Sequence, residues 1–289
     1  QSVTHAEEAG APTTVATAAA PNMADLWSSN HGWTIISVLN LGQVRNEDKP
    51  YKNGKCKKGV NAKMRHLIVN FPGHITVFQE YDENFMHKKD LDKFHIIAPR
   101  EEGFEHGVAI LARRYNDKNN KPCIQEAILL ESACITKKPA SPKKDKSWTP
   151  LMVVRIDLPH GKSVRILNMH FSYHQAKKET GYNEAYRQVI NKMVELINRH
   201  GVHLLIGDFN GAAKDIADIL KEKGITATMD DDLKELERVA EANGEGQPLR
   251  IFQIGTVNPC KKINVDFDRP DFSAHPPLIR GFGGRKSSD

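Results

Sequence analysis

Short runs of apolar and β-branched residues recur along the chain, separated by polar stretches. Runs of about four to eight such residues are typical of buried β-strands. Six segments fit this pattern: residues 34–40, 74–80, 107–114, 151–158, 163–171 and 203–209. The pattern therefore predicts a core built mainly from short strands.

A second pattern, with apolar residues three and four positions apart, predicts amphipathic helices. It occurs over residues 60–71 and again over residues 186–197, shortly before His200 and Gly201. Residues 231–243 read as an acidic surface helix, and a shorter helix is expected at 212–223. Strands mixed with helices favour packed α/β layers.

The length of 289 residues is compatible with one domain, and no long linker divides the chain. We expect a flexible leader over residues 1–25, one domain over residues 26–282 and a flexible tail over residues 283–289. Two basic stretches, 45–59 and 137–148, interrupt the pattern. They are either solvated loops or loops that contact phosphate groups.

Composition narrows the classes of protein only moderately. The chain is 39% hydrophobic and 27% charged, and no apolar run approaches the roughly 20 residues needed to cross a bilayer, so no transmembrane segment is expected. The net charge of +5 favours an acidic partner such as nucleic acid or phospholipid. The four cysteines are widely spaced and form no paired metal motif, which slightly favours an intracellular, reducing location.

Polar residues stand at the ends of several predicted strands. In LLIGDFNG, residues 204–211, the strand ends in Asp208 and Asn210, which can orient water or hold a phosphate oxygen; a simple turn is the alternative. Glu80 follows another strand and suits Mg²⁺, although it can equally be an exposed strand-end acid. Asn40 closes the first strand and can join Glu80 around a metal.

Two histidines complete the candidate set. His170 ends the strand SVRILNMH and can hydrogen-bond a carboxylate or a phosphate oxygen, but such histidines are often structural. His275 precedes two prolines and can donate to a phosphate oxygen, or it is an ordinary loop residue.

Taken together, these motifs are more specific than any one of them. In order, they are an asparagine at a first strand end, QE, NxH, GDFN and SxHxP, spread over about 240 residues. This series resembles the endonuclease/exonuclease/phosphatase, or DNase-I-like, superfamily. The resemblance implies a four-layer α/β fold, in which a sandwich of two mixed β-sheets is flanked by helices.

The resemblance also implies a role for each matching residue. Asn40 and Glu80 would lie at a Mg²⁺ ion, or Mn²⁺ in its place, and His170 and His275 would surround the scissile phosphate. Asp208 and Asn210 would act on the attacking water and the phosphate. The expected activity is metal-dependent hydrolysis of a phosphodiester, with nucleic acid as the leading substrate.

Two positions depart from the family pattern. The family reads SDHxP, whereas this chain has Ala274 between Ser273 and His275, so one carboxylate of the site is missing. The family also has RxDY before a strand, where this chain has Arg250 followed by Ile251 and Phe252. Loss of a catalytic carboxylate can reduce the rate by orders of magnitude.

The departures leave several functions open. Ala274 is consistent with deliberate replacement, with divergence to weak or altered catalysis, or with a chain that only binds. A phosphoinositide or sphingolipid phosphohydrolase is the nearest enzymatic alternative to a nuclease. A noncatalytic module that binds nucleic acid or protein is the alternative from a different class. The sequence leaves DNA against RNA and the oligomeric state open.

Overall fold

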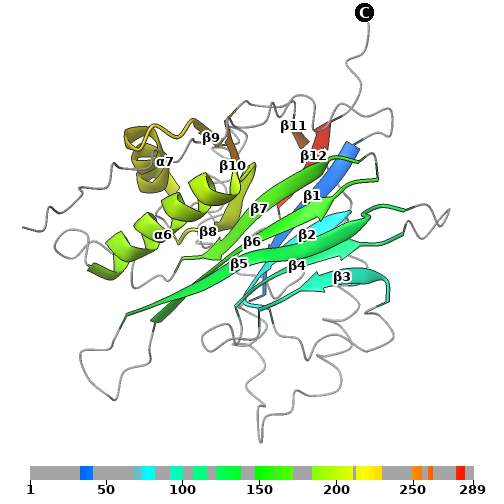
Figure 1. Cartoon of the computed structure of the whole chain (residues 1–289), viewed down its shortest axis with the longest axis horizontal. Coiled ribbons are helices and arrows are strands. Elements are labelled where there is room, and N and C mark those ends of the chain that lie inside the picture. The colour runs from blue at the N-terminus through cyan, green and yellow to red at the C-terminus, as the bar shows by residue number, and fades with distance from the viewer. Residues whose placement is uncertain are drawn as a thin grey trace, which may run out of the picture.

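The computed structural model describes the strands and two helices that carry most of the candidate site. The described residues are 33–41, 69, 73–81, 92–99, 107–115, 122–137, 147–159, 161–171, 184–210, 213–229, 249–255, 260–262 and 278–283. They form two mixed sheets that pack face to face (Figure 1).

The first sheet contains six strands in the order β11-β12-β1-β2-β4-β3. The pair β1–β2 is parallel, and every other neighbouring pair in this sheet is antiparallel. The strand bounds are Trp33–Asn40 for β1, Ile75–Gln79 for β2, Phe94–Ile97 for β3, Val108–Arg113 for β4, Cys260–Lys262 for β11 and Leu278–Gly283 for β12.

The second sheet also contains six strands, in the order β5-β6-β7-β8-β10-β9. Here the parallel pair is β7–β8, again with antiparallel neighbours. The strand bounds are Glu126–Lys137 for β5, Ser147–Asp157 for β6, Ser163–His170 for β7, Leu204–Asp208 for β8, Ala227–Met229 for β9 and Arg250–Ile254 for β10.

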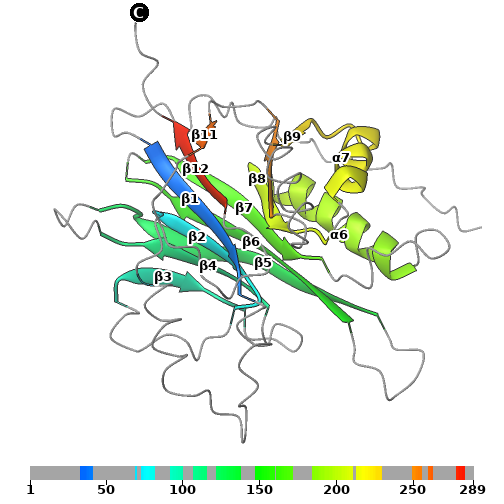
Figure 2. The ribbon, with the colours of Figure 1, turned by 180° about the vertical axis from the view of Figure 1, so that it is seen from behind.

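Two helices, α6 (Glu184–His200) and α7 (Ala213–Glu222), cover the outer face of the second sheet. Both views of the ribbon place them on the same side of that sheet (Figures 1 and 2). Apolar residues of α6 such as Val189 and Met193 pack with Leu167 and Leu205 of the sheet. The amphipathic spacing of the sequence thus supplies an outer layer on this sheet.

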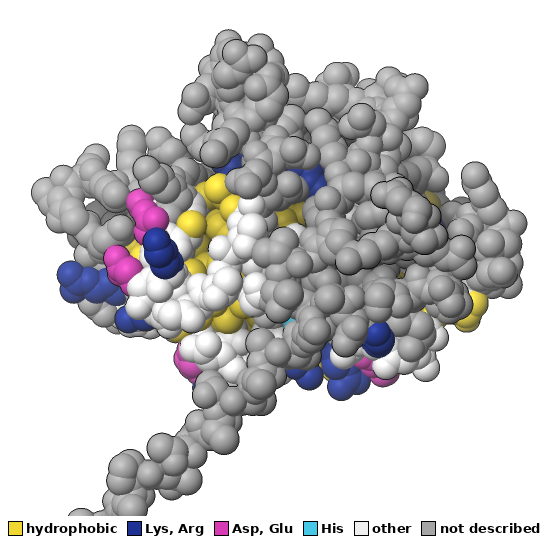
Figure 3. Space-filling view, turned by 90° about the horizontal axis from the view of Figure 1, so that it is seen from above, with side chains coloured by type: hydrophobic (Ala, Val, Ile, Leu, Met, Phe, Trp, Pro, Cys, Tyr) yellow, Lys and Arg dark blue, Asp and Glu magenta, His cyan; other side chains and the backbone are white. Residues whose placement is uncertain are grey.

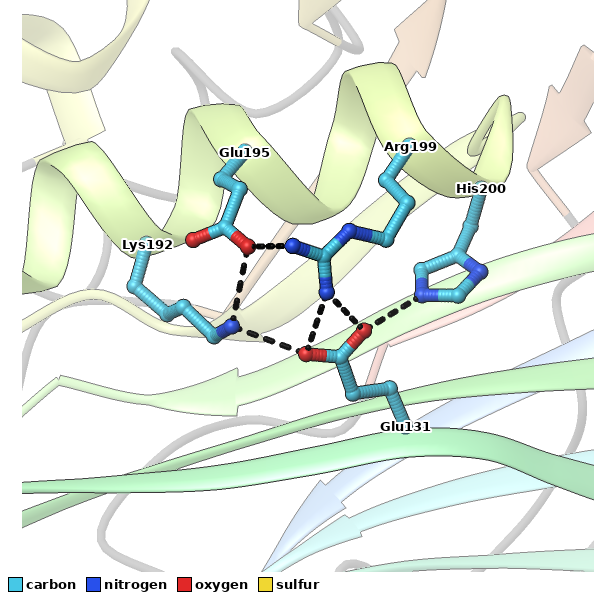
Figure 4. A network of polar contacts seen from close by, with 5 residues as sticks. All are labelled: Glu131, Lys192, Glu195, Arg199 and His200. Atoms are coloured by element: carbon cyan, nitrogen blue, oxygen red, sulfur yellow. Dashed lines mark hydrogen bonds and ion pairs between the residues drawn. The ribbon is translucent and has the colours of Figure 1, made fainter.

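Polar contacts between α6 and β5 add to this apolar packing (Figure 4). The Glu131 carboxylate accepts hydrogen bonds from Lys192 Nζ at 2.8 Å and from Arg199 Nη1 at 2.9 Å, and His200 Nε2 lies 2.7 Å from it. Glu195 pairs with both Lys192 and Arg199. This cluster ties the helix to β5, where the register shifts between Leu129 and Glu131.

The core between the sheets is made by the alternate residues of each strand that face inward. Ile36 and Val38 of β1 meet Ile166 of β7 and Ile206 of β8 in one buried cluster. Residues at the intervening positions, such as Leu39 and Leu205, belong to separate clusters on the two outer faces. This period of two follows from the pleat of a strand.

All six predicted strands are confirmed, and the predicted two-sheet α/β sandwich is confirmed as well. The helices predicted at 186–197 and 212–223 are present as α6 and α7. The predicted helices at 60–71 and 231–243 lie outside the described residues, apart from helical Val69. The sequence did not predict the twelve-residue strand β5, nor the shorter strands β3, β9, β10, β11 and β12.

No described helix is both long enough and apolar enough to cross a membrane. In the view from above, the Lys and Arg side chains that are visible among the described residues lie in separate groups, some of them with Asp or Glu beside them (Figure 3).

Candidate functional site

The two parallel strand pairs turn from apolar to polar at their carboxyl ends. On the inward face, Ile36 and Val38 lead to Asn40 in β1, and Leu204 and Ile206 lead to Asp208 in β8. The other two strands follow the same course. Ile75 and Val77 precede Gln79 in β2, and Val164 and Ile166 precede Asn168 and His170 in β7. The core of the sandwich therefore ends in a cluster of polar side chains.

Asn40 links the two sheets at this cluster. Its Nδ2 atom donates to Asp208 Oδ2 at 2.8 Å and lies 3.5 Å from Glu80 Oε1. Asn40 and Asp208 are buried, with exposed fractions of 2% and 1%. Because both carboxylates lie within 3.5 Å of one nitrogen atom, the structure brings these three candidate residues together.

Glu80 and His170 form the more accessible side of the cluster. His170 Nε2 lies 3.8 Å from Glu80 Oε1, and the two side chains are 19% and 25% exposed. Glu80 has a positive φ of 57°, which bulky L-residues seldom adopt. A residue held in this conformation right after a strand points its side chain in a direction that the strand itself would not allow.

Asp208 is held on both of its carboxylate oxygens. Oδ2 accepts from Asn40, and Oδ1 accepts from the backbone N–H of Asn210 at 3.0 Å. Asn210 has a φ of 45°, and its side-chain amide donates to the carbonyl of Phe171 and lies 3.4 Å from His170 Nε2. The GDFN segment is therefore both a turn and part of the polar cluster, so the two interpretations of it are compatible.

Gly207 is required by the close approach of β7 and β8. A Cβ atom at this position would lie 2.1 Å from the carbonyl oxygen of Met169, far inside contact distance. On the other side of Asp208, Phe209 is buried and packs edge-on against Phe252 at 5.4 Å between ring centroids. These two neighbours fix the position of the Asp208 backbone.

A buried cation lies beside the same strand. Arg250 of β10 pairs with Gly207 and is 1% exposed. Burial lowers the pKa of its guanidinium to about 10, while attraction to the Asp208 carboxylate acts in the opposite direction. A buried positive charge therefore lies near the strand that carries Asp208, and the sequence did not predict it, although arginine inside an apolar strand is an unusual pattern.

The assignment of Phe252 as the position of the missing family aspartate is wrong. Phe252 faces outward with Phe209 and the helices, whereas Ile251 faces the core between the sheets on the same side as Asp208. Because successive residues of a strand alternate between faces, an aspartate at position 252 could not reach the site. His275 and Ala274 lie outside the described residues.

Two residues of the motifs QE and NxH, Gln79 and Asn168, make contacts that the sequence did not predict. Gln79 Nε2 donates to Asn168 Oδ1 at 2.9 Å, and both residues are fully buried. Asn168 Nδ2 donates to the carbonyl oxygens of Phe78 at 3.0 Å and Ala109 at 3.1 Å in the other sheet. The signal was present, since both residues occupy inward-facing positions that would otherwise be apolar.

The donors in the cluster fit a hard divalent cation. Mg²⁺ prefers oxygen ligands, and proteins commonly hold it through one or two carboxylates while it keeps several waters. Glu80, Asp208 and the Asn40 carboxamide oxygen are such donors. Within the described part of the chain, no group of three or more His, Cys, Asp or Glu side chains is arranged to hold a metal. Oxygen donors of this type are those that hard cations prefer, whereas zinc is commonly bound by Cys and His.

Comparisons with known proteins identify the fold. No protein-family model matches the sequence, and a search of curated proteins also found no match. Solved structures do match. A conserved protein of unknown function from Enterococcus faecalis has a TM-score of 0.55 and 15% identity, over 87% of this chain and all of that one.

Two further structures share the fold over similar lengths. An endonuclease/exonuclease/phosphatase from Bacteroides vulgatus has a TM-score of 0.53 and 16% identity, over 88% of this chain and 99% of that one. A humanized TDP2 from D. rerio has a TM-score of 0.51 and 14% identity, over 87% and 99%. The chain therefore shares the two-sheet fold of these structures, which is the DNase-I-like fold that its motifs predicted.

Proposed function

We propose that this chain carries the site of a metal-dependent phosphodiesterase that acts on nucleic acid. The observation that carries the proposal is Asn40, which brings Asp208 and Glu80 from opposite sheets to one nitrogen atom. A TDP2 structure from D. rerio that contains a single-stranded DNA product has the same fold, with a TM-score of 0.50 and 14% identity over 87% of this chain and 99% of that one. The net charge of +5 is consistent with a polyanionic substrate.

In this proposal, Glu80, Asp208 and Asn40 would hold Mg²⁺, with Mn²⁺ as a substitute. The bound ion would polarise a phosphoryl oxygen and neutralise the charge that develops there. Asp208, fixed on both oxygens, orients a water molecule and accepts its proton as the new P–O bond forms. Asn210 and His170 hold phosphate oxygens while the bond to the departing oxygen breaks.

The decisive experiment measures Mg²⁺-dependent cleavage of labelled single- and double-stranded DNA and RNA. Three forms are compared: the chain itself, Ala274→Asp, and Ala274→Asp combined with Asp208→Ala. We expect Ala274→Asp to raise cleavage by at least about 100-fold and the second change to abolish the gain. Asp218→Ala, at an exposed position of α7, is the matched control for removing an aspartate.

Absence of cleavage by all forms, with folding confirmed, contradicts a nuclease. The same variants are then tested on phosphoinositide and sphingolipid headgroups. Turnover of these lipids would identify a lipid-headgroup phosphohydrolase. Tight binding of nucleic acid or protein without turnover, even in Ala274→Asp, would identify a noncatalytic module, the alternative that Ala274 itself favours.

A further inference from the structure

We infer that Gln79 and Asn168 are positioning residues of this site. Their buried hydrogen bonds hold the carboxyl end of β2 against β7 and thereby set the distance of Glu80 from Asp208. The inference rests on the proposed function, because it concerns the same site. It assigns a purpose to the two motif residues that the chemistry leaves unused.

The Asn168 side chain makes three hydrogen bonds, and all of them cross between the sheets. Its amide group donates to the carbonyl oxygens of Phe78 in β2 and Ala109 in β4, and its oxygen accepts from Gln79 in β2. The distances lie between 2.9 and 3.1 Å, and Asn168 and Gln79 are both 0% exposed. One side chain of β7 thus connects two strands of the opposite sheet.

The location of this bridge separates it from ordinary core packing. Val164 and Ile166 occupy the same face of β7, and they contact the other sheet through apolar groups alone. Apolar contact is not directional, so it resists the sliding of one sheet over the other only weakly. Hydrogen bonds require defined distances and angles, so they fix the relative position of the two strands.

The bridge is also adjacent to the site, both along the chain and in the structure. Gln79 immediately precedes Glu80, and Asn168 lies two positions before His170 on the same face of β7. Fixing these two residues therefore fixes the groups that approach each other at the site, including the 3.8 Å contact of His170 with Glu80. Residues that orient metal ligands commonly change metal affinity by about 10- to 100-fold when they are replaced.

The test compares four variants of the whole chain: Asn168→Leu, Gln79→Met, the double variant and Val164→Ala. The last removes apolar volume from the same face of β7, away from the site, and is the control for lost stability. Two quantities are measured. Calorimetric titration gives the affinity for Mn²⁺, with Asp208→Ala as the reference without a site. In metal-free protein, NMR gives the solvent exchange rate of the Asn40 side-chain amide protons, which the bond to Asp208 slows.

We expect Asn168→Leu to weaken Mn²⁺ binding at least about tenfold and to accelerate exchange at Asn40, beyond any effect of Val164→Ala. Gln79→Met removes one of the three bonds, so a loss of about fivefold is expected, and this milder variant decides the matter if Asn168→Leu does not fold. The double variant should add little to Asn168→Leu, because both changes break one bridge.

Two results would overturn the positioning role. One is Mn²⁺ affinity and Asn40 exchange in Asn168→Leu that match those of Val164→Ala. The other applies if only Gln79→Met folds, and it is Mn²⁺ affinity and Asn40 exchange in Gln79→Met that match those of Val164→Ala. A chain that binds no Mn²⁺ at all contradicts the proposed function instead, and the exchange rates of Asn40 still decide whether the bridge positions the site.

Discussion

Each sheet contains one parallel strand pair, and the strands around it follow the same order of directions in both sheets. Neighbouring strands pair in the order antiparallel, parallel, antiparallel, antiparallel, both along β12-β1-β2-β4-β3 and along β6-β7-β8-β10-β9. If the twelve strands are divided into β1–β6 and β7–β12, the last two strands of each set join the sheet of the other set. The pair β5–β6 lies beside β7, and the pair β11–β12 lies beside β1. The strand arrangement therefore repeats, with these two strand pairs exchanged.

The repeat extends to single hydrogen bonds at the amino ends of the pairs. His74 Nδ1 accepts from the backbone N–H of Ile35 at 2.9 Å, and His203 Nδ1 accepts from that of Arg165 at 3.0 Å. In each pair the histidine backbone also donates to the carbonyl oxygen of the same partner residue. A histidine thus begins the second strand of both pairs in the same way.

The carboxyl ends differ, and the site lies where they differ. Counting from the two histidines, Gln79 corresponds to Asp208, and Phe78 corresponds to Gly207. Asn40 corresponds to His170 through the pairing of each first strand with its second. A repeated backbone brings two strand ends together, while unlike side chains give the cluster an acid, an amide and an imidazole. The two strand pairs therefore share their backbone geometry but differ in the chemistry of their side chains.

The largest expected effect comes from giving β8 the side chain that Gly207 lacks. Gly207→Ala places a Cβ 2.1 Å from a backbone oxygen, which cannot rotate away, so we expect a loss of about 3 kcal/mol or more in the free energy of unfolding. Urea denaturation measures it. Gly224→Ala is the control, because only its φ of 71° opposes the change, at about 1 kcal/mol. Equal losses in the two variants would contradict the close approach.

The histidine pair predicts a pH dependence of stability. Burial lowers the pKa of His203 to about 4 from 6.5, aided by the nearby Arg165 charge. As the pH falls below 6.5 the unfolded chain takes up a proton first, so stability is greatest above pH 6.5 and declines until about pH 4. The decline is at most about 3 kcal/mol from this residue.

His203→Gln should reduce this pH slope when urea unfolding is compared at pH 8 and pH 5. His74→Gln should reduce it less, because His74 is only partly buried, although burial and Arg113 lower its pKa in the same direction. An unchanged slope in His203→Gln would mean that His203 is not held neutral in the fold.

The helical cover of the second sheet gives a smaller effect in a separate pH range. Hydrogen bonds from Lys192 first, and then from His200 and Arg199, lower the pKa of Glu131 to about 2 from 4.5. The stabilisation is therefore complete above pH 4.5 and is lost as the pH falls through about 2. Because solvent screens a partly exposed cluster, Glu131→Gln should cost about 1 kcal/mol at pH 7, measured by thermal unfolding. A loss that persists unchanged at pH 2 would contradict this origin.

The smallest expected change in stability is at the strained end of the first pair. Glu80→Gly suits a φ of 57° and removes side-chain contacts, so the free energy of unfolding should change by less than about 1 kcal/mol. Under the proposed function, Mn²⁺ binding should nevertheless disappear in calorimetric titration. Retained binding would remove Glu80 from the proposed ligands, whereas Glu80→Gln tests the carboxylate with the side-chain length preserved.

The sequence predicted strands well where the apolar run was continuous and ended in a polar residue. The segment 203–209 is an example, since one stretch indicated both the strand β8 and its candidate site residue Asp208. Strand β5 was missed because the register shift between Leu129 and Glu131 breaks its alternation. Phe252 was misassigned because the motif alone does not show which face of the strand each of its residues occupies.

By itself, the sequence determined which residue types stand at the strand ends and which faces are apolar, since local spacing controls both. Only the tertiary structure decided that Asn40 contacts Asp208, 168 residues away, and that Asn168 connects two sheets. It also decided that the strand arrangement repeats with two strand pairs exchanged. Such contacts depend on how the sheets pack against each other, and no local pattern of residues encodes the distance between atoms on different sheets.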